Sequence, residues 1–135
     1  LLSDHKVILL LNDILFVHGG VLPFHINHGI DLINRETTDW MRGLGSPSSV
    51  MATNDAPIWS RHYSLETDQG DCDLLESVLN QTGAQKMVVA HTVQDEINAA
   101  CMEQVWRVDV GLSAHYGGTP QVLEFLDGEI NILSE

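Results

Sequence analysis

The sequence has few basic residues and a large excess of acidic ones. It contains 6 lysines and arginines against 19 aspartates and glutamates, which gives a formal net charge of −13 at pH 7. A field of that sign repels phosphate backbones and anionic membrane surfaces, so we expect neither nucleic acid nor a membrane as a partner. A phosphorylated substrate fits this charge only if bound divalent cations first invert the local potential.

Cysteine is also scarce, since the chain carries only Cys72 and Cys101. Two cysteines without a paired spacing favour reduced thiols over a disulfide framework, and we expect a cytoplasmic location. No segment approaches the roughly 18–20 apolar residues of a transmembrane helix, and the N-terminus lacks the basic flank of a signal peptide.

Motifs for a covalent nucleophile are missing as well. The chain has no Gly-x-Ser-x-Gly elbow, and neither cysteine stands in a recognisable activating environment. A glycine-rich phosphate-binding loop is also absent. The sequence therefore gives little support to nucleophilic catalysis.

The pattern of elements indicates an α/β or α+β fold with a mixed sheet that ends in an antiparallel hairpin. Residues 1–135 fit one modest domain without linkers or repeats. The chain lacks an initiator methionine and enters an apolar run almost at once, so we expect it to be a piece of a longer protein. The predicted elements are a buried strand within 7–17, a helix over 29–40, an irregular segment over 43–57, a helix over 71–80 with Asp71 as N-cap and Gly83 past its end, a turn or short helix within 93–102, strands over 86–90 and 105–111, and a hairpin around Asp127-Gly128.

Two histidines follow apolar runs directly. His18 ends the first run and precedes Gly19 and Gly20, which allow the backbone a sharp turn and a close approach. His91 ends the run 86–90. Two strand-end histidines could meet on one rim of a sheet, as catalytic and metal-binding side chains do in α/β proteins.

Four side chains suggest phosphoester chemistry. His18, His91 and Asp109 are donor types that suit a divalent ion such as zinc, manganese or iron. Arg61 could clamp a phosphoryl group in a forked geometry. Metal and arginine together point toward phosphoester hydrolysis by a metal-activated water.

Each of these residues also has a purely structural interpretation. Either histidine could be a core histidine bonded to a carbonyl, which is about as common as ligation. Arg61 could pack on the rings of Trp59 and Tyr63. Asp109 could pair with Arg107 across the strand face or accept backbone hydrogen bonds at a strand end. The other histidines, His62 included, have no context that lifts them above surface or structural roles.

Four segments, taken in order, resemble the C-terminal half of calcineurin-like metallophosphoesterases, and most closely the Shewanella-like branch of the serine/threonine phosphoprotein phosphatases. The resemblance extends over nearly the whole chain. The segments are Phe16-Val17-His18-Gly19-Gly20-Val21-Leu22-Pro23, Pro57-Ile58-Trp59-Ser60-Arg61, Val88-Val89-Ala90-His91-Thr92 and Arg107-Val108-Asp109-Val110-Gly111-Leu112-Ser113.

The resemblance implies a fold and a site. The fold would be half of a four-layer αββα sandwich with a centre of two divalent ions, manganese, iron or zinc, at the strand ends. His18 and His91 would ligate the same ion, Arg61 would hold the substrate phosphate, and Asp109 would have a supporting role. The substrate would be a phosphoprotein or a small phosphoester.

The chain departs from that family in two ways. Ala90 stands where the family has glycine before the second histidine, so a methyl group must fit there. The family's first-half metal motifs do not occur in this sequence. Because two histidines cannot fill the coordination of a divalent ion, we expect the chain to be inactive alone and to need the missing N-terminal half as its partner. Alone, its uncovered strand edges and apolar surface should cause self-association.

Two other functions are compatible with the same residues. A dinucleoside polyphosphate hydrolase of the same superfamily would also carry His-Gly-Gly. A non-catalytic binding module would explain the missing half, although it would not need His18, His91 and Arg61.

Overall fold

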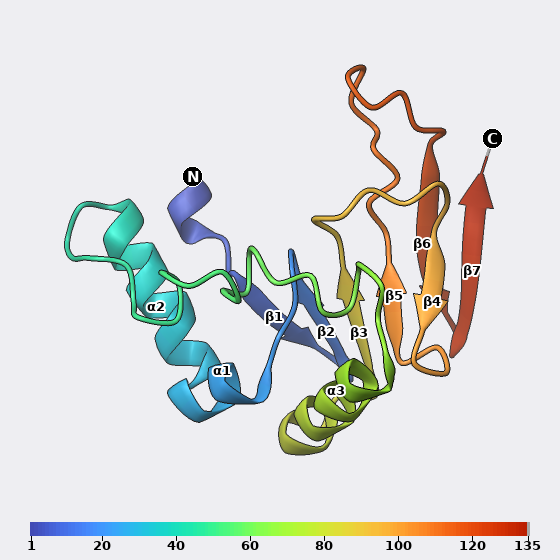
Figure 1. Cartoon of the computed structure of the whole chain (residues 1–135). Coiled ribbons are helices and arrows are strands. Elements are labelled where there is room, and N and C mark those ends of the chain that lie inside the picture. The colour runs from blue at the N-terminus through green and yellow to red at the C-terminus, as the bar shows by residue number, and fades with distance from the viewer. Residues whose placement is uncertain (135) are drawn as a thin grey trace.

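The computed structural model describes residues 1–134, which form a five-stranded sheet and a separate two-stranded hairpin (Figure 1). The strand order in the sheet is β1-β2-β3-β5-β4, in which β2, β3 and β5 are parallel and the two edge strands are antiparallel to their neighbours. The expected mixed sheet and C-terminal antiparallel hairpin are confirmed. The strands are β1 (Ile8–Leu11), β2 (Ile14–Val17), β3 (Lys86–Val89), β4 (Asn98–Ala100), β5 (Val105–Arg107), β6 (Gln121–Leu126) and β7 (Glu129–Ser134). The helices are the 3₁₀ turn η1 (Leu2–Asp4), α1 (Pro23–His28), α2 (Ile30–Met41) and α3 (Gln69–Thr82).

The sheet lies between the helices and the β6–β7 hairpin (Figure 1). One face packs Leu15 and Met87 against Leu75 of α3 in the larger core. On the other face, Trp106 belongs to a smaller cluster against which Phe125 of the hairpin packs. Within residues 1–134, no helix has the length and apolar character needed to span a bilayer.

The first apolar run forms two strands instead of the single strand expected over residues 7–17. Strands β1 and β2 pair antiparallel, with Leu11 opposite Ile14. The turn between them consists of Asn12 and Asp13, and Asn12 has a φ of 55°. Asparagine tolerates this left-handed conformation, which allows so tight a reversal. The prediction was wrong because long apolar stretches on both sides concealed a two-residue turn.

The N-cap of helix α3 is Asp68, three residues earlier than the predicted Asp71. The Asp68 carboxylate accepts a hydrogen bond from the Asp71 amide at 3.0 Å, and Asp71 accepts one from the Asp68 amide at 3.1 Å. This reciprocal pair satisfies two helix-end donors. The prediction of Asp71 as N-cap was wrong because aspartate occupies both positions. Gly83 ends the helix with a φ of 73°, as predicted.

The predictions for the second half of the chain are largely confirmed. Strand β3 and the β6–β7 hairpin lie where expected, and both turn residues, Asp127 and Gly128, have positive φ, as a two-residue turn of this kind needs. Strand β5 ends at Arg107, short of the expected limit at residue 111. The segment 93–102, predicted as a turn or short helix, contains the edge strand β4.

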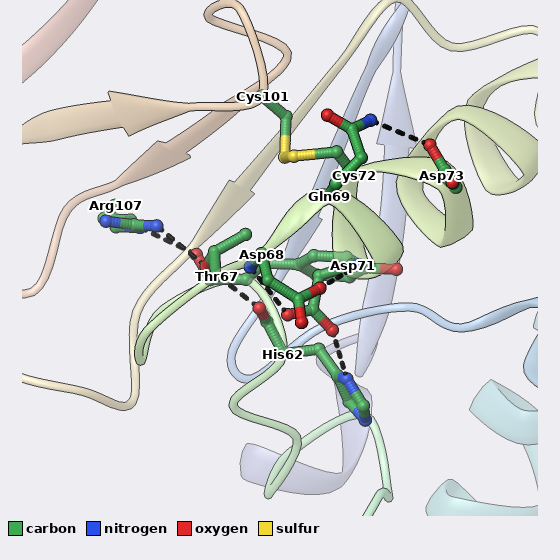
Figure 2. The surroundings of a disulfide bond; sticks show 10 residues. His62, Thr67, Asp68, Gln69, Asp71, Cys72, Asp73, Cys101 and Arg107 are labelled. Atoms are coloured by element: carbon green, nitrogen blue, oxygen red, sulfur yellow. Dashed lines mark hydrogen bonds and ion pairs between the residues drawn. A yellow bond between two sulfur atoms is a disulfide. The ribbon is translucent and has the colours of Figure 1, made fainter.

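Cys72 and Cys101 form a disulfide, which corrects the expectation of free thiols (Figure 2). The bond joins the first turn of α3 to the residue after β4, and the two Cα atoms are 5.3 Å apart. The residues are separated by 29 positions in sequence, so only the packing of α3 beside the sheet brings them together. Sequence spacing carries no sign of that packing.

Candidate active site

His18 and His91 meet at one edge of the sheet. The parallel strands β2 and β3 end at the same edge, and these residues follow them closely. His18 Nε2 and His91 Nδ1 are 3.2 Å apart, and the ring centroids are 5.0 Å apart. The Ala90 amide donates to the His18 carbonyl at 2.8 Å, so the backbone pairing extends up to the histidines.

Gly19 is required by a close backbone approach, and Gly20 leaves room for the Tyr63 ring. The amides of Gly19 and Gly20 both donate to the Pro57 carbonyl, at 2.7 and 3.1 Å. A Cβ at Gly19 would lie 2.8 Å from the Ser60 carbonyl oxygen and 2.9 Å from that of Pro57. His-Gly-Gly therefore fixes the segment that carries Arg61 directly beside the histidine pair.

The backbone at His91 is strained, and its ring is partly desolvated. His91 has a φ of 63°, a left-handed conformation that non-glycine residues seldom adopt. Ala90, the departure from the family pattern, is half-buried and keeps its backbone hydrogen bond. Trp59 covers the His91 ring with an edge contact at 5.3 Å.

Burial, together with the positive charge of Arg61, lowers the pKa of His91, and Asp109 opposes that shift. A lowered pKa keeps the imidazole neutral at pH 7, which is the form that ligates metals. His91 Nε2 is buried and has no hydrogen-bond partner among the described atoms. The Nδ1 atom faces His18, so the two lone pairs available for a shared ligand are those of His18 Nε2 and His91 Nδ1.

Arg61 is exposed beside this pair. Within the part of the chain that the structure describes, its guanidinium makes no ion pair and does not stack on Trp59 or Tyr63. Tyr63 is fully buried, and its hydroxyl donates to the Val21 carbonyl at 3.0 Å. The packing interpretation of Arg61 is therefore not what the structure shows. A groove of about 300 Å³ extends from it, lined by Asn54, Asp55, Trp59, Arg61, His62, Leu65 and Asp71.

Asp109 lies two residues past the end of β5, near enough to His91 to affect its pKa. Its carboxylate accepts a hydrogen bond from the Gly111 amide at 3.1 Å. Arg107 bonds elsewhere, so of the two structural interpretations the backbone bond is the one observed.

Sequence reasoning gave no role to His62. Its Nδ1 lies 2.6 Å from an Asp71 carboxylate oxygen, and its Nε2 lies 3.5 Å from one of Asp55. The only sequence signal is its position directly after Arg61, which was not sufficient to single it out.

The number of metal donors is small. Within residues 1–134, no group of three or more histidine, cysteine, aspartate or glutamate side chains is arranged to hold a metal ion. The structure thus brings together His18 and His91 as a pair of donors, with Arg61 beside them and Asp109 close to His91.

The fold is that of part of a larger phosphatase structure. The chain superposes with a TM-score of 0.77 on a cold-active protein-tyrosine phosphatase from a psychrophilic Shewanella species, over 97% of this chain and 41% of that one, at 21% identity. A second structure, of a cold-active protein tyrosine phosphatase, matches with a TM-score of 0.74 over 99% of this chain and 44% of that one, at 22% identity. At such identities the likeness concerns the fold alone.

Sequence similarity points the same way. The chain is 35% identical over 131 residues to Shewanella-like protein phosphatase 2 from Arabidopsis thaliana, which covers 91% of this chain. It spans about a third of that relative, 33% of its length. No family model matches the chain. The resemblance to a Shewanella-like protein phosphatase is thus confirmed as similarity in sequence, and the fold matches that of part of a cold-active protein-tyrosine phosphatase. The wider metallophosphoesterase class stays a prediction.

Proposed function

We propose that this chain forms part of the active site of a metal-dependent phosphoester hydrolase similar to serine/threonine protein phosphatases. The observation that supports it most is the His18–His91 pair, with the exposed Arg61 beside it. A metal site and a phosphate clamp at one sheet edge are the minimum that metal-assisted phosphoester hydrolysis needs. The similarity to a Shewanella-like protein phosphatase supports the same chemistry.

The two histidines fit a divalent ion. Metal–nitrogen bonds of about 2.0–2.1 Å, at angles between octahedral and tetrahedral values, place two ligating nitrogens roughly 2.9–3.4 Å apart. The observed separation of His18 Nε2 and His91 Nδ1 is 3.2 Å. The remaining ligands, and those of the second ion that the resemblance implies, would come from a segment outside this sequence.

Each residue has a definite task in the proposed reaction. His18 and His91 would hold one ion, and the Asp109 carboxylate would have a supporting role as a negative charge near His91. Arg61 binds the phosphate oxygens and neutralises charge that grows in the transition state. When bound, a divalent ion polarises a phosphoryl oxygen and lowers the pKa of a coordinated water.

The proposed N-terminal partner half would cover the free part of the sheet. A groove of about 480 Å³ opens next to His18, and its lining includes Leu9 together with Phe16 and Val88 from the face of the sheet on which the hairpin packs. A second sheet packed on this groove would complete the four-layer sandwich and place its ligands near His18.

The proposed cytoplasmic location depended on reduced cysteines, so the disulfide removes its basis.

The test is manganese-dependent hydrolysis of p-nitrophenyl phosphate by the chain alone and after mixing with a segment that supplies the other ligands. We expect activity only in the mixture, its loss in His18→Ala, and its retention in His5→Ala, a histidine that is exposed. No activity in any mixture, with no metal retained, would favour the binding module.

Substrate choice is tested in the same mixture. We expect phosphoserine and phosphothreonine peptides to be hydrolysed. Phosphotyrosine peptides belong in the panel because the structures of like fold are named protein tyrosine phosphatases. A dinucleoside polyphosphate is the remaining alternative, and its preferential hydrolysis would contradict the protein phosphatase proposal.

A further inference from the structure

We infer that Arg107 is a positioning residue, which holds the turn carrying Arg61 in register with the histidine edge of the sheet. The inference rests on the proposed function, because it concerns the arginine that would clamp the phosphate. Arg107 lies at the end of β5, and the turn it contacts comprises residues 61–67.

The Arg107 guanidinium donates three hydrogen bonds, two of them to this turn. Its Nε donates to the Tyr63 carbonyl at 2.7 Å, and its Nη2 donates to the Thr67 hydroxyl at 2.8 Å. The third bond, from Nη1 to the Asn98 side chain at 3.2 Å, anchors it to β4. Figure 2 shows the guanidinium directed at Thr67. A single side chain thus joins the turn to two strands.

The partners of Arg107 are all neutral. Within residues 1–134 it forms no ion pair with a carboxylate, although it is half-buried and burial lowers its pKa. Desolvating a cation without a counter-ion is costly, so an apolar side chain would fill the same space more favourably. What an apolar side chain lacks is the forked set of donors that fixes the turn in one geometry.

Thr67 relays this restraint to the residue next to Arg61. The Thr67 hydroxyl accepts from Arg107 and donates to the His62 carbonyl at 2.9 Å (Figure 2). The His62 ring is held in turn by Asp71 of α3 at 2.6 Å. His62, the residue that follows Arg61, is therefore fixed from both the sheet and the helix, while Arg61 itself forms no ion pair within residues 1–134.

Strand pairing connects Arg107 to the histidines. Arg107 is in register with Val89 of β3, and the Val108 amide donates to the Val89 carbonyl at 2.9 Å. His91 follows Val89 by two residues, so the end of β5 that carries Arg107 lies at the same edge of the sheet as His91. Displacing Arg107 would thus change the distance between the phosphate clamp and the metal pair.

The test uses the complete enzyme, the chain assembled with the segment that supplies the other ligands. Arg107→Met keeps the length and removes all three hydrogen bonds. We expect kcat/KM for p-nitrophenyl phosphate to fall by ~10–100-fold, mainly through KM, with bound metal unchanged. Arg107→Lys, which can reach only part of the acceptors, should recover some of the loss. Arg42→Met, which removes the same charge from an exposed ion pair, should leave kcat/KM unchanged.

A double-mutant cycle separates this inference from the proposed function. In an Arg61→Ala background, Arg107→Met should have no further effect, because the clamp it positions is gone. Thr67→Val, a milder change, should reduce kcat/KM in the same direction if Arg107→Met fails to fold. An unchanged kcat/KM in both variants, or an equal loss in the Arg61→Ala background, would overturn the inference. If Arg61→Ala itself has no effect, the phosphate clamp of the proposed function fails and the positioning role fails with it.

Discussion

The histidine pair and the Arg61 turn belong to the same proposed site but are held in place in different ways. His18 and His91 follow adjacent parallel strands closely, so the pairing of β2 with β3 brings them to the same edge of the sheet. The Arg61 turn belongs to a segment without regular structure. It depends on hydrogen bonds between residues far apart in sequence, such as Arg107 with Tyr63, 44 positions apart. The comparison shows that a residue at a strand end is positioned by the strand that precedes it. The position of a loop residue depends instead on contacts with distant parts of the fold.

The largest expected effect comes from breaking the histidine side. We predict that His18→Ala lowers the metal-dependent activity of the complete enzyme by about 10²-fold or more, since it removes one of the two donors of this chain. The fold should persist, because His18 is exposed. Activity and bound metal, measured side by side with circular dichroism, check this. Full activity in the variant would show that the pair is not a metal site.

The second effect concerns the disulfide, which joins α3, the helix that follows the Arg61 turn, to the residue after β4. Reduction, or the double change Cys72→Ser and Cys101→Ser, should lower the free energy of unfolding by about 3–4 kcal/mol, as the closure entropy of a loop of this length indicates. The bond spans 29 positions. Denaturant unfolding with and without a reductant measures this loss in the free energy of unfolding. Identical midpoints would mean that the bond does not restrain the chain.

The third prediction is a pH dependence centred on His25, a fully buried residue of α1 near Asp55, which lines the groove beside Arg61. Burial lowers the pKa of His25 to about 4, and the backbone of Asp55 only partly offsets this. Below its usual pKa the unfolded chain binds a proton that the folded chain excludes. Stability should therefore be complete above about pH 6.5 and fall by roughly 1.4 kcal/mol per pH unit towards pH 4.

His25→Asn provides the control for that pH dependence. Its carbonyl can still accept from the Leu22 amide, which bonds His25 Nδ1 in the native chain at 2.9 Å. We expect the variant to be less stable at pH 7 but to have a flatter profile between pH 6.5 and 4, measured by urea unfolding. An equal slope in both proteins would assign the dependence to other groups.

The smallest effect probes the contact between the two regions. Gly19→Ala places a Cβ within 2.9 Å of the Pro57 and Ser60 carbonyl oxygens, so the backbone there must shift. We predict a loss of about 1–3 kcal/mol in stability. Gly43→Ala is a poor control because its φ is 75°, whereas Gly45→Ala has open space and no positive φ. If Gly19→Ala and Gly45→Ala have equal stability, the close approach is not a constraint.

The same contrast explains what the sequence could predict. Apolar runs followed by His18 and His91, and the turn Asp127-Gly128, are local signals, and the structure follows them. The approach of Cys72 to Cys101 arises from tertiary packing and was missed. The three acceptors of Arg107 include a backbone carbonyl, which has no signature in a sequence.

The measurement that tests the central claim most directly is a Zn²⁺ titration of this chain assembled with the segment that supplies the other ligands, followed by the side-chain ¹⁵N resonances of this chain's histidines. We predict that His18 Nε2 and His91 Nδ1, 3.2 Å apart, shift together with one midpoint, and that His91→Ala abolishes the shift at His18. Separate midpoints, or an undiminished shift of His18 in His91→Ala, would contradict a shared metal site.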